Sequence, residues 1–335
     1  NRRKLTFDNS GQSEDLTDFP VLVTLTGSRI NYSATQNSGQ DIRFIDEDGF
    51  TILSHEIEEW DESGTSIVWV KIPQIDASSN TDYIHMYYGN SGASDGQDVN
   101  DVWSNSYVTV LHFAEESGDF VDSTGNNNWA RESDVTRNAS GPMGPALSFD
   151  GTDDFLAMNM SYSGTGAVPA LTLLTWFNST YSSGTWNNNW AFIDFDRSEY
   201  YDFYLEGDGG LGFSTTGSGT NELSSTTNGQ NDGSWHCGYA TFDGTTKRLY
   251  MDGSPDGSTT AAGAFGTTNT RWGIIGDGSE ATAFAHPYSS SNNNNIYYDG
   301  LMDEVRIAHV QRSDDWIAAQ FDSMNDGFIT YASEE

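Results

Sequence analysis

The chain has 335 residues, of which 49 are acidic and only 14 are Lys or Arg, so its formal net charge at pH 7 is −35. A surface of this charge repels nucleic acid and anionic membranes, which makes both unfavourable partners. The length suits two β domains, and abundant strand-forming residues, with 35 glycines for turns, predict an all-β fold.

Charge and cysteine content point to the same compartment. A net charge of −35 suits a cation-rich solvent, such as a marine or hypersaline exterior or a calcium-rich wall, where salt screens self-repulsion. Cys237 is the single cysteine, so no internal disulfide forms, and the strand-like stretch 235–240 predicts a buried, inert thiol. No apolar stretch approaches the ~18 residues of a membrane-spanning helix. We expect an extracellular or cell-surface protein whose signal peptide was cleaved or precedes these residues.

The first hundred residues alternate between apolar and polar side chains, as half-buried strands do. Strands are predicted at residues 3–7, 19–25, 41–45, 51–53, 66–72 and 82–88. Asp48-Gly49, between the third and fourth of these, is a strong hairpin-turn signal. Residues 89–100 are rich in Gly, Ser, Asp and Asn, which predicts a linker and a first domain spanning residues 1–103.

Residues 104–335 carry a longer series of strands and form the predicted second domain. The strands are predicted at residues 107–113, 146–149, 155–158, 171–177, 190–195, 201–205, 211–214, 235–242, 248–252, 272–275 and 301–307. Their short spacing is typical of a two-sheet jelly roll. One short C-terminal helix is predicted, because Ser313 can cap it, Asp314 and Asp315 lie in its first turn, and apolar residues recur on one face up to Met324.

The first predicted domain resembles an uncharacterised β domain that often precedes laminin-G-like domains in exported bacterial and archaeal proteins. The motifs that carry this resemblance are residues 19–23 (FPVLV), 40–44 (QDIRF), 48–49 (DG), 68–73 (VWVKIP) and 87–90 (YYGN). The resemblance implies a β-sandwich accessory domain.

Residues 104–330 resemble the concanavalin-A-like, laminin-G-type jelly rolls. The motifs are residues 111–113 (LHF), 122–126 (DSTGN), 147–151 (LSFDG), 173–177 (LLTWF), 248–253 (RLYMDG), 300–307 (GLMDEVRI) and 312–317 (RSDDWI). Such domain pairs recur in surface proteins and adhesins, where many of the jelly rolls bind glycans or proteins and hold a structural calcium ion. The resemblance implies that Asp122, the Gly151 carbonyl and Asp303 converge as ligands of Ca²⁺. Without the resemblance, Asp150-Gly151 is an ordinary turn motif.

One acidic run has the composition of a glycosidase strand. Glu56 and Glu58 would share a strand face with Cα atoms ~6.8 Å apart, from which their carboxyl groups could approach the separation of a retaining glycosidase pair. The run lies in the first domain and reads Glu-Ile-Glu-Glu-Trp, not the Glu-x-Asp-x-x-Glu of concanavalin-A-like glycosidases. The six histidines lack metal-ligand spacing, and no nucleophile elbow or phosphate loop occurs. We therefore assign no catalytic residue.

Ligand contact is predicted where Trp and Tyr adjoin Asn. The runs 186–190 (WNNNW) and 288–298 combine rings that stack on the apolar faces of sugars with amides that bridge hydroxyl groups. The predicted ligand-binding residues are Trp186, Asn187, Trp190 and Tyr288. For Trp190 the alternative is a core position at the start of its strand.

These observations combine into one hypothesis and two alternatives. The hypothesis is an extracellular binding or adhesion module of a larger surface protein, which recognises a glycan or protein partner and holds structural calcium. The alternatives are a structural spacer or filament subunit without a small ligand, and a polysaccharide-degrading enzyme. A glycan array separates a binding module from a spacer, and release of reducing ends tests for the enzyme.

The charge imbalance yields a first prediction. With a formal net charge of −35 the folded chain repels itself, and salt screens this repulsion beyond ~10 Å at 0.1 M. The melting temperature, measured by calorimetry, should keep rising as sodium chloride increases well above 0.1 M. A flat or falling curve would show that pairing or bound ions already neutralise the acidic side chains.

Overall fold

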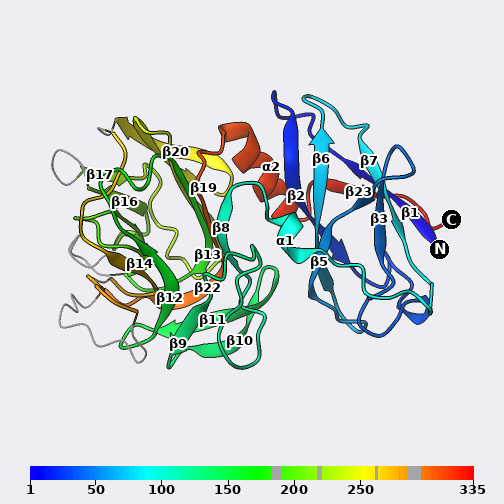
Figure 1. The fold of residues 1–335 in the computed structure, drawn as a ribbon, viewed down its shortest axis with the longest axis horizontal. Coiled ribbons are helices and arrows are strands. Elements are labelled where there is room, and N and C mark those ends of the chain that lie inside the picture. The colour runs from blue at the N-terminus through cyan, green and yellow to red at the C-terminus, as the bar shows by residue number, and fades with distance from the viewer. Residues whose placement is uncertain (183–189, 217–220, 261–262, 279, 285–295) are drawn as a thin grey trace. The chain divides into compact units, whose positions relative to one another are not determined.

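The computed structural model describes residues 1–182, 190–216, 221–260, 263–278, 280–284 and 296–335. The chain forms two compact units: unit 1 comprises residues 1–105 and 313–335, and unit 2 comprises residues 106–312. Antiparallel sheets build both units (Figure 1), which confirms the predicted all-β fold. Within the described ranges, no helix is long and apolar enough to cross a membrane.

Unit 1 is a sandwich of two sheets around an apolar core. The three-stranded sheet is ordered β2 (Leu16–Leu25), β6 (Ser66–Ile75) and β5 (His55–Glu59). The five-stranded sheet is ordered β23 (Ile329–Tyr331), β1 (Arg2–Phe7), β7 (Tyr83–Tyr87), β3 (Arg43–Asp46) and β4 (Ile52–Leu53). Alternate residues such as Val21 and Val23 of β2 and Val68 and Val70 of β6 face the shared core, as the period of two requires. A single 3-10 turn, Tyr32–Ala34, lies between β2 and β3.

Short polar segments of unit 1 are fixed by side-chain hydrogen bonds. The predicted Asp48-Gly49 turn joins β3 to β4, and Asp48 Oδ1 accepts the N–H groups of Phe50 (2.8 Å) and Thr51 (2.9 Å). The predicted linker, by contrast, packs on unit 1. Arg43 donates to the Ser94 carbonyl (2.6 Å), and the Ile57 N–H donates to Gln97 Oε1 (2.6 Å). The segment then enters the short helix α1 (Val99–Val102).

The C-terminal segment belongs to unit 1, whereas the sequence predicted that it ends the second domain. The predicted helix forms as α2 (Asp314–Met324), with the Ser313 hydroxyl accepting the Trp316 N–H (3.0 Å). Its Trp316 ring meets Phe19 of β2 edge-on at 4.7 Å, and Figure 1 shows α2 beside β2. β23 then adds to the edge of β1, with Leu5 opposite Tyr331. The apolar face of α2 and the free edge of β1 therefore determine where residues 313–335 fold.

Unit 2 is a larger two-sheet sandwich. Its first sheet is ordered β10 (Thr136–Gly141), β11 (Gly144–Asp150), β22 (Asp299–Ala308), β13 (Leu171–Asn178), β18 (His236–Phe242), β19 (Thr246–Met251) and β20 (Ser254–Thr260), with β8 (Tyr107–Leu111) also paired to β22. Its second sheet is ordered β17 (Asn221–Ser224), β16 (Leu211–Thr215), β15 (Tyr201–Leu205), β14 (Trp190–Asp194), β21 (Arg271–Ile275), β12 (Phe155–Tyr162) and β9 (Ala130–Ser133). An aromatic-rich core lies between them, with Phe177, Phe192 and Phe203 among its members. The lone thiol of Cys237 is buried in β18, and burial raises its pKa.

Strand β22 changes partner part-way along its length. On one side it pairs with β13 throughout, and on the other it pairs first with β11 and then with β8. The register against β13 shifts between Leu174, opposite Arg306, and Trp176, opposite Asp303, so Glu304 lies in the bulge, where it has a φ of +55°. A left-handed backbone at a non-glycine residue costs about 1 kcal/mol or more. The surrounding sheet therefore holds two fully buried acids at a strained bulge.

A buried histidine in unit 1 makes folding sensitive to pH. His55 is 0% exposed, its ring lies 5.5 Å from the Phe44 ring, and neither ring nitrogen has a hydrogen-bond partner among the described residues. Burial, with a smaller contribution from the charge of Arg43, lowers the pKa of His55 to about 4. The unfolded chain, with a histidine pKa of about 6.5, therefore takes up this proton first as pH falls.

The free energy of unfolding of unit 1 should accordingly hold above pH 6.5 and fall by about 3 kcal/mol as pH drops towards 4. His55→Phe, which keeps a ring against Phe44, should remove most of this loss. Hydrogen exchange of the β6 amides, followed as a function of pH, measures this loss in the free energy of unfolding. His85→Phe, at a half-buried position on β7, is the matched control and should keep the loss; equal slopes in wild type and His55→Phe would contradict the assignment.

Candidate functional site

A groove of about 460 Å³ opens within unit 2 where polar amides meet aromatic rings. We call it the Asn–Trp groove. It is lined by Val108, Asn126, Asn128, Asn159, Met160, Ser161, Tyr162, Trp272 and His309. None of these described lining residues is Asp, Glu, Lys or Arg, although the chain carries 49 acidic side chains. The groove therefore offers hydrogen-bonding groups and rings without a formal carboxylate or cation.

The amides of the groove are held by one loop and one strand. Asp122 organises the loop, because its carboxylate accepts the N–H groups of Val110 (3.1 Å), Thr124 (3.0 Å) and Asn128 (2.9 Å). Two amide Nδ2 groups then bind backbone carbonyls: Asn128 donates to Val108 (2.6 Å), and Asn159 of β12 donates to Asn127 (3.0 Å). These bonds fix the amide planes before any ligand arrives.

The aromatic wall of the groove continues into a row of rings that pack in tilted and edge-on geometries. The Tyr162 hydroxyl lies 2.8 Å from Nε2 of His309 and 3.3 Å from the Tyr201 hydroxyl, and burial raises the pKa of Tyr162, so it stays neutral. The half-buried Trp272 ring packs against Phe284 at 5.8 Å. Phe284 in turn packs against Trp129 at 5.3 Å, and the Arg131 guanidinium stacks on Trp129 at 4.7 Å. Trp272 is thus supported from behind and keeps its place at the groove.

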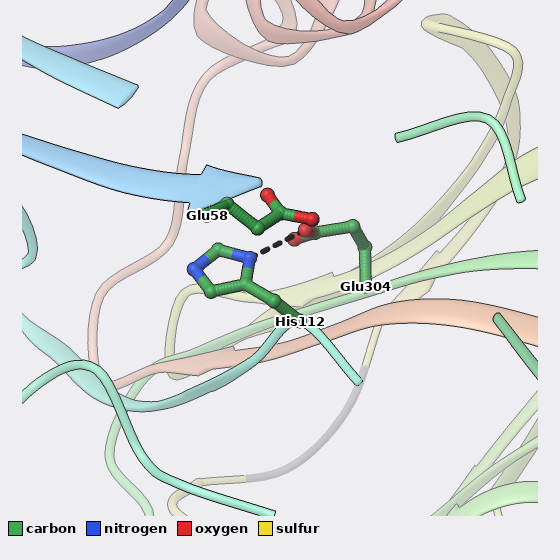
Figure 2. A group of neighbouring side chains, drawn as sticks. All are labelled: Glu58, His112 and Glu304. Carbon is green, nitrogen blue, oxygen red and sulfur yellow. Dashed lines mark hydrogen bonds and ion pairs between the residues drawn. The ribbon is translucent and has the colours of Figure 1, made fainter. Parts of the chain in front are cut away.

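A buried ionic cluster surrounds the bulge of β22. His112 Nδ1 lies 2.5 Å from Glu304 Oε1, and a dashed line joins the two side chains in Figure 2. Arg306 Nε donates to Glu304 Oε2 at 2.7 Å. Burial alone would raise the pKa of Glu304, but the charges of Arg306 and His112 outweigh it and lower that pKa. The pKa of the adjacent Asp303 is raised, by burial first and by Glu304 second. Glu304 is therefore ionised and bound on both oxygens, which suits a structural ion pair that stabilises the bulge.

The turn after β11 gathers a second set of acids. Ligand oxygens of Asp150, Asp153 and Asp154 all lie within 4.8 Å of one another. The Asp150 N–H donates to Asp154 Oδ2 (2.8 Å), and burial, followed by the charges of Asp150 and Asp153, raises the pKa of Asp154 to about 6. Gly151 has a φ of +71°, and a side chain there would meet Asp299. Closely spaced hard oxygens of this kind suit calcium.

Sequence comparison identifies the fold of unit 2. The family described as the concanavalin A-like lectin/glucanases superfamily matches residues 150–318, just over half of the 335 residues. The chain belongs to the concanavalin A-like lectin/glucanases superfamily. A second family, described as a domain of unknown function (DUF2341), matches residues 38–132. The two matches confirm the predicted order of an accessory β domain and a superfamily jelly roll, while the superfamily match runs six residues into the segment that folds with unit 1.

Several solved structures are similar to this superfamily member. The binding domain of Paraclostridial Mosquitocidal Protein 1 is 12% identical with a TM-score of 0.48, over 68% of this chain and 53% of that chain. The binding domain of Botulinum Neurotoxin DC in complex with SialylT is 13% identical with a TM-score of 0.48, over 68% and 52%. Domain 4 of AbnA, a GH43 extracellular arabinanase from Geobacillus stearothermophilus solved with arabinotriose, is 16% identical with a TM-score of 0.47, over 64% and 97%. The chain spans about half the length of the two toxin domains. No curated protein matches the sequence.

The structure separates the residues predicted to share a calcium ion. Asp122 is occupied by the loop donors described above. Asp303 is fully buried and accepts the Met143 N–H at 3.3 Å, in the hairpin between β10 and β11. Gly151 lies beyond Asp299 at the other end of the β11–β22 ladder, so at least four residues, or about 13 Å of strand, separate it from Asp303. One ion therefore cannot bind both Gly151 and Asp303. Of the three residues predicted to bind calcium, only Gly151 lies in the Asp150–Asp154 turn.

The residues predicted for ligand contact fall in two groups. Trp186, Asn187 and Tyr288 lie outside the described residues, so their contact with a ligand stays a prediction. Trp190 is 5% exposed at the start of β14, and its ring meets Tyr181 edge-on at 4.7 Å. Its position matches the core alternative.

The pair of acids considered for catalysis binds tryptophans. Trp103 Nε1 donates to Glu56 Oε2 (2.5 Å), and Trp69 Nε1 donates to Glu58 Oε2 (2.7 Å). The two indole rings lie 5.3 Å apart. These carboxylates therefore anchor a tryptophan pair in unit 1, and the register shift in β5 next to them adjusts their spacing.

The sequence carries one signal for the groove that the predicted contacts did not include. Residues 126–129 read Asn-Asn-Asn-Trp, the same tetrapeptide as residues 187–190 within the predicted contact run. The first copy supplies Asn126 and Asn128 to the groove, and its Trp129 supports Phe284. Trp272 and Asn159 carry no comparable local signal, because they meet this loop only through the pairing of β9, β12 and β21.

Proposed function

We propose that this chain is an extracellular binding module that recognises an uncharged glycan in the Asn–Trp groove. The observation that carries the proposal is the meeting of three asparagines and a supported Trp272 ring in a groove of about 460 Å³ without charged lining residues. Small-ligand sites combine a hydrophobic or aromatic surface with a few fixed polar groups in this way.

The chemistry of the groove fits a sugar ring. The Trp272 face offers an apolar platform for the C–H groups of a pyranose, while fixed amides offer hydrogen bonds to its hydroxyl groups. Because Asn128 and Asn159 already donate from Nδ2 to the backbone, little side-chain entropy is lost on binding. The net charge of −35 opposes sulfated or carboxylated glycans, which supports an uncharged ligand.

An extracellular or cell-surface location is part of this proposal. The acidic composition suits a solvent rich in cations, and the single cysteine is buried with a raised pKa, so it is protected from oxidation. The module would act within a larger surface protein, whose other domains would place it at its glycan or protein partner.

The groove is tested by binding of the whole chain to a glycan array, followed by titration of the best neutral oligosaccharide. Trp272→Ala should weaken binding at least about tenfold, because loss of a central ring costs about 2 kcal/mol. Asn126→Ala should weaken it less.

Phe50→Ala is the matched control, since Phe50 is an aromatic of unit 1 that is 88% exposed, and it should bind like wild type. Unchanged affinity in folded Trp272→Ala would place the site elsewhere. Absence of any binding across the array would instead favour the structural spacer.

Structural calcium is the second part of the proposal, with Asp150, Asp153 and Asp154 as its ligands in place of Asp122 and Asp303. These side chains fit the ion, because their oxygens lie within 4.8 Å of one another and none forms an ion pair with Lys or Arg among the described residues. Calcium supplies charge neutralisation at this turn, and Asp299, whose side chain lies against Gly151, adds a further carboxylate nearby.

Calcium at about 100 times its dissociation constant should raise the melting temperature of unit 2 by roughly 5–10 °C over chelator-treated protein. Asp153→Asn should abolish most of this rise in differential scanning calorimetry. Glu47→Gln, which removes one exposed acid of unit 1, should keep it. An equal rise in wild type and Asp153→Asn would rule out the turn as the calcium site.

A further inference from the structure

Two asparagines of the Asn–Trp groove are anchored to the backbone through their nitrogen atoms. Asn128 Nδ2 donates to the Val108 carbonyl (2.6 Å), and Asn159 Nδ2 donates to the Asn127 carbonyl (3.0 Å). A carbonyl oxygen only accepts hydrogen bonds, so the end of the amide that faces it has to be the NH₂ group. The orientation of both amides is therefore fixed, and each Oδ1 atom is directed away from the carbonyl that holds its side chain.

The amide oxygen atoms of the groove are free to accept hydrogen bonds. Oδ1 of Asn128 and Oδ1 of Asn159 accept none from any residue that the structure describes, and neither atom is enclosed by protein. The third asparagine, Asn126, is exposed, and its Nδ2 lies 2.9 Å from Thr124 Oγ1 and 3.3 Å from two backbone carbonyls. Its Oδ1 likewise has no partner within the described ranges. All three asparagines line the groove, so each brings an unused acceptor to it.

Hydrogen-bond donors are fewer than acceptors among the lining side chains. The Tyr162 hydroxyl already lies between His309 Nε2 (2.8 Å) and another tyrosine hydroxyl (3.3 Å). The Trp272 indole, the other ring nitrogen of His309 and the second N–H groups of two amides remain, and the Ser161 hydroxyl acts in either direction. Because each amide oxygen has two lone pairs, the three asparagines offer more acceptor positions than these groups offer donors. The groove therefore complements a ligand that donates.

Charge favours the same direction of hydrogen bonding. The net charge of the chain is −35, and no described residue that lines the groove is Lys or Arg. Behind the loop, the buried carboxylate of Asp122 accepts the Asn128 N–H (2.9 Å). A negative potential at the groove favours the positive hydrogen of a ligand hydroxyl over its oxygen.

We propose that the Asn–Trp groove selects its glycan by hydroxyl groups that donate to Oδ1 of Asn126, Asn128 and Asn159. This inference rests on the proposed function of the groove and specifies the class of sugar. A free hydroxyl group donates and accepts, whereas an O-methyl or O-acetyl group only accepts. The groove takes neutral sugars whose hydroxyl groups are unsubstituted, and it discriminates against the O-methylated and O-acetylated forms of the same sugars, which leave the amide oxygens without a donor.

The probes are neutral trisaccharides of glucose, mannose, galactose, xylose and arabinose, each unmodified and with one hydroxyl at a time replaced by fluorine or by an amino group. Fluorine is close to a hydroxyl in size but has no proton to donate, whereas a protonated amino group only donates. The trisaccharide whose binding to the whole chain is weakened most by Trp272→Ala is titrated in all its forms. At hydroxyls that meet the amides, fluorine should weaken binding about three- to tenfold, and the amino group should preserve or strengthen it.

Each fluorine effect should be traceable to one asparagine by combining the two changes. In the variant that lacks the accepting amide, which is Asn126→Ala, Asn128→Ala or Asn159→Ala, fluorination of that hydroxyl should no longer reduce affinity. Asn231→Ala is the matched control, because Asn231 also donates from Nδ2 to a carbonyl, that of Tyr181 (2.9 Å), but does not line the groove. It should keep the full fluorine effect.

Two results would overturn the inference while the proposed function stands: equal weakening by fluorine and by amino groups, or fluorine effects that persist in all three alanine variants, each with Trp272→Ala still weakening the unmodified sugar. Absence of binding to every unmodified trisaccharide would instead contradict the proposed neutral-glycan site, and this inference with it. If one alanine variant does not fold, as judged by circular dichroism, the other two decide the question.

Discussion

Around many carboxylates of this chain, backbone N–H groups supply the hydrogen bonds that Lys and Arg side chains supply in less acidic proteins. Fourteen Lys and Arg side chains cannot pair with 49 acids, and the structure uses turns instead. Asp48 and Asp122 each accept main-chain donors, as does Asp243, whose pKa is lowered because hydrogen bonds from the Thr245 hydroxyl and from backbone N–H groups outweigh burial. Each such bond has two effects: it fixes the backbone of a loop between strands, and it stabilises the negative charge of a carboxylate.

Two kinds of acid remain outside this arrangement. Glu304 is buried beside Arg306 and His112, where an ion pair holds a strained bulge at the point where β22 exchanges β11 for β8. Burial raises the pKa of Asp202 to about 7, and Asp202 forms no ion pair with a described Lys or Arg. The difference is one of charge supply: Arg306, two residues along β22, neutralises Glu304, whereas the guanidinium of Arg197, whose charge acts on Asp202, forms its ion pair with Glu222.

Local pattern predicted most of the fold and little of the site. Alternation located most strands, though not β9, β10, β17 or β20, and local sequence also located the Asp48-Gly49 turn and the capped helix at Ser313, because these depend on neighbouring residues. It misplaced the helix and missed β23, since both are positioned by β2 and β1, some 300 residues away. The predicted set of calcium ligands does not converge for a related reason. Family motifs identify residues along the chain, but the β11–β22 register determines how far Gly151 lies from Asp303. The groove depends likewise on the pairing of β9, β12 and β21.

The composition of the groove suits the cation-rich solvent that we propose for this chain. In concentrated salt, attraction between charges is screened within a few ångströms, so recognition by ion pairs loses strength. Ring stacking and hydrogen bonds from fixed amides are short-ranged and are not screened in this way. A groove lined by rings and fixed amides, as we propose for glycan binding, would therefore lose little strength in such a solvent. None of the nine described lining residues of the Asn–Trp groove is acidic, and Asp122 contributes from behind the loop by holding Asn128 rather than by facing the ligand.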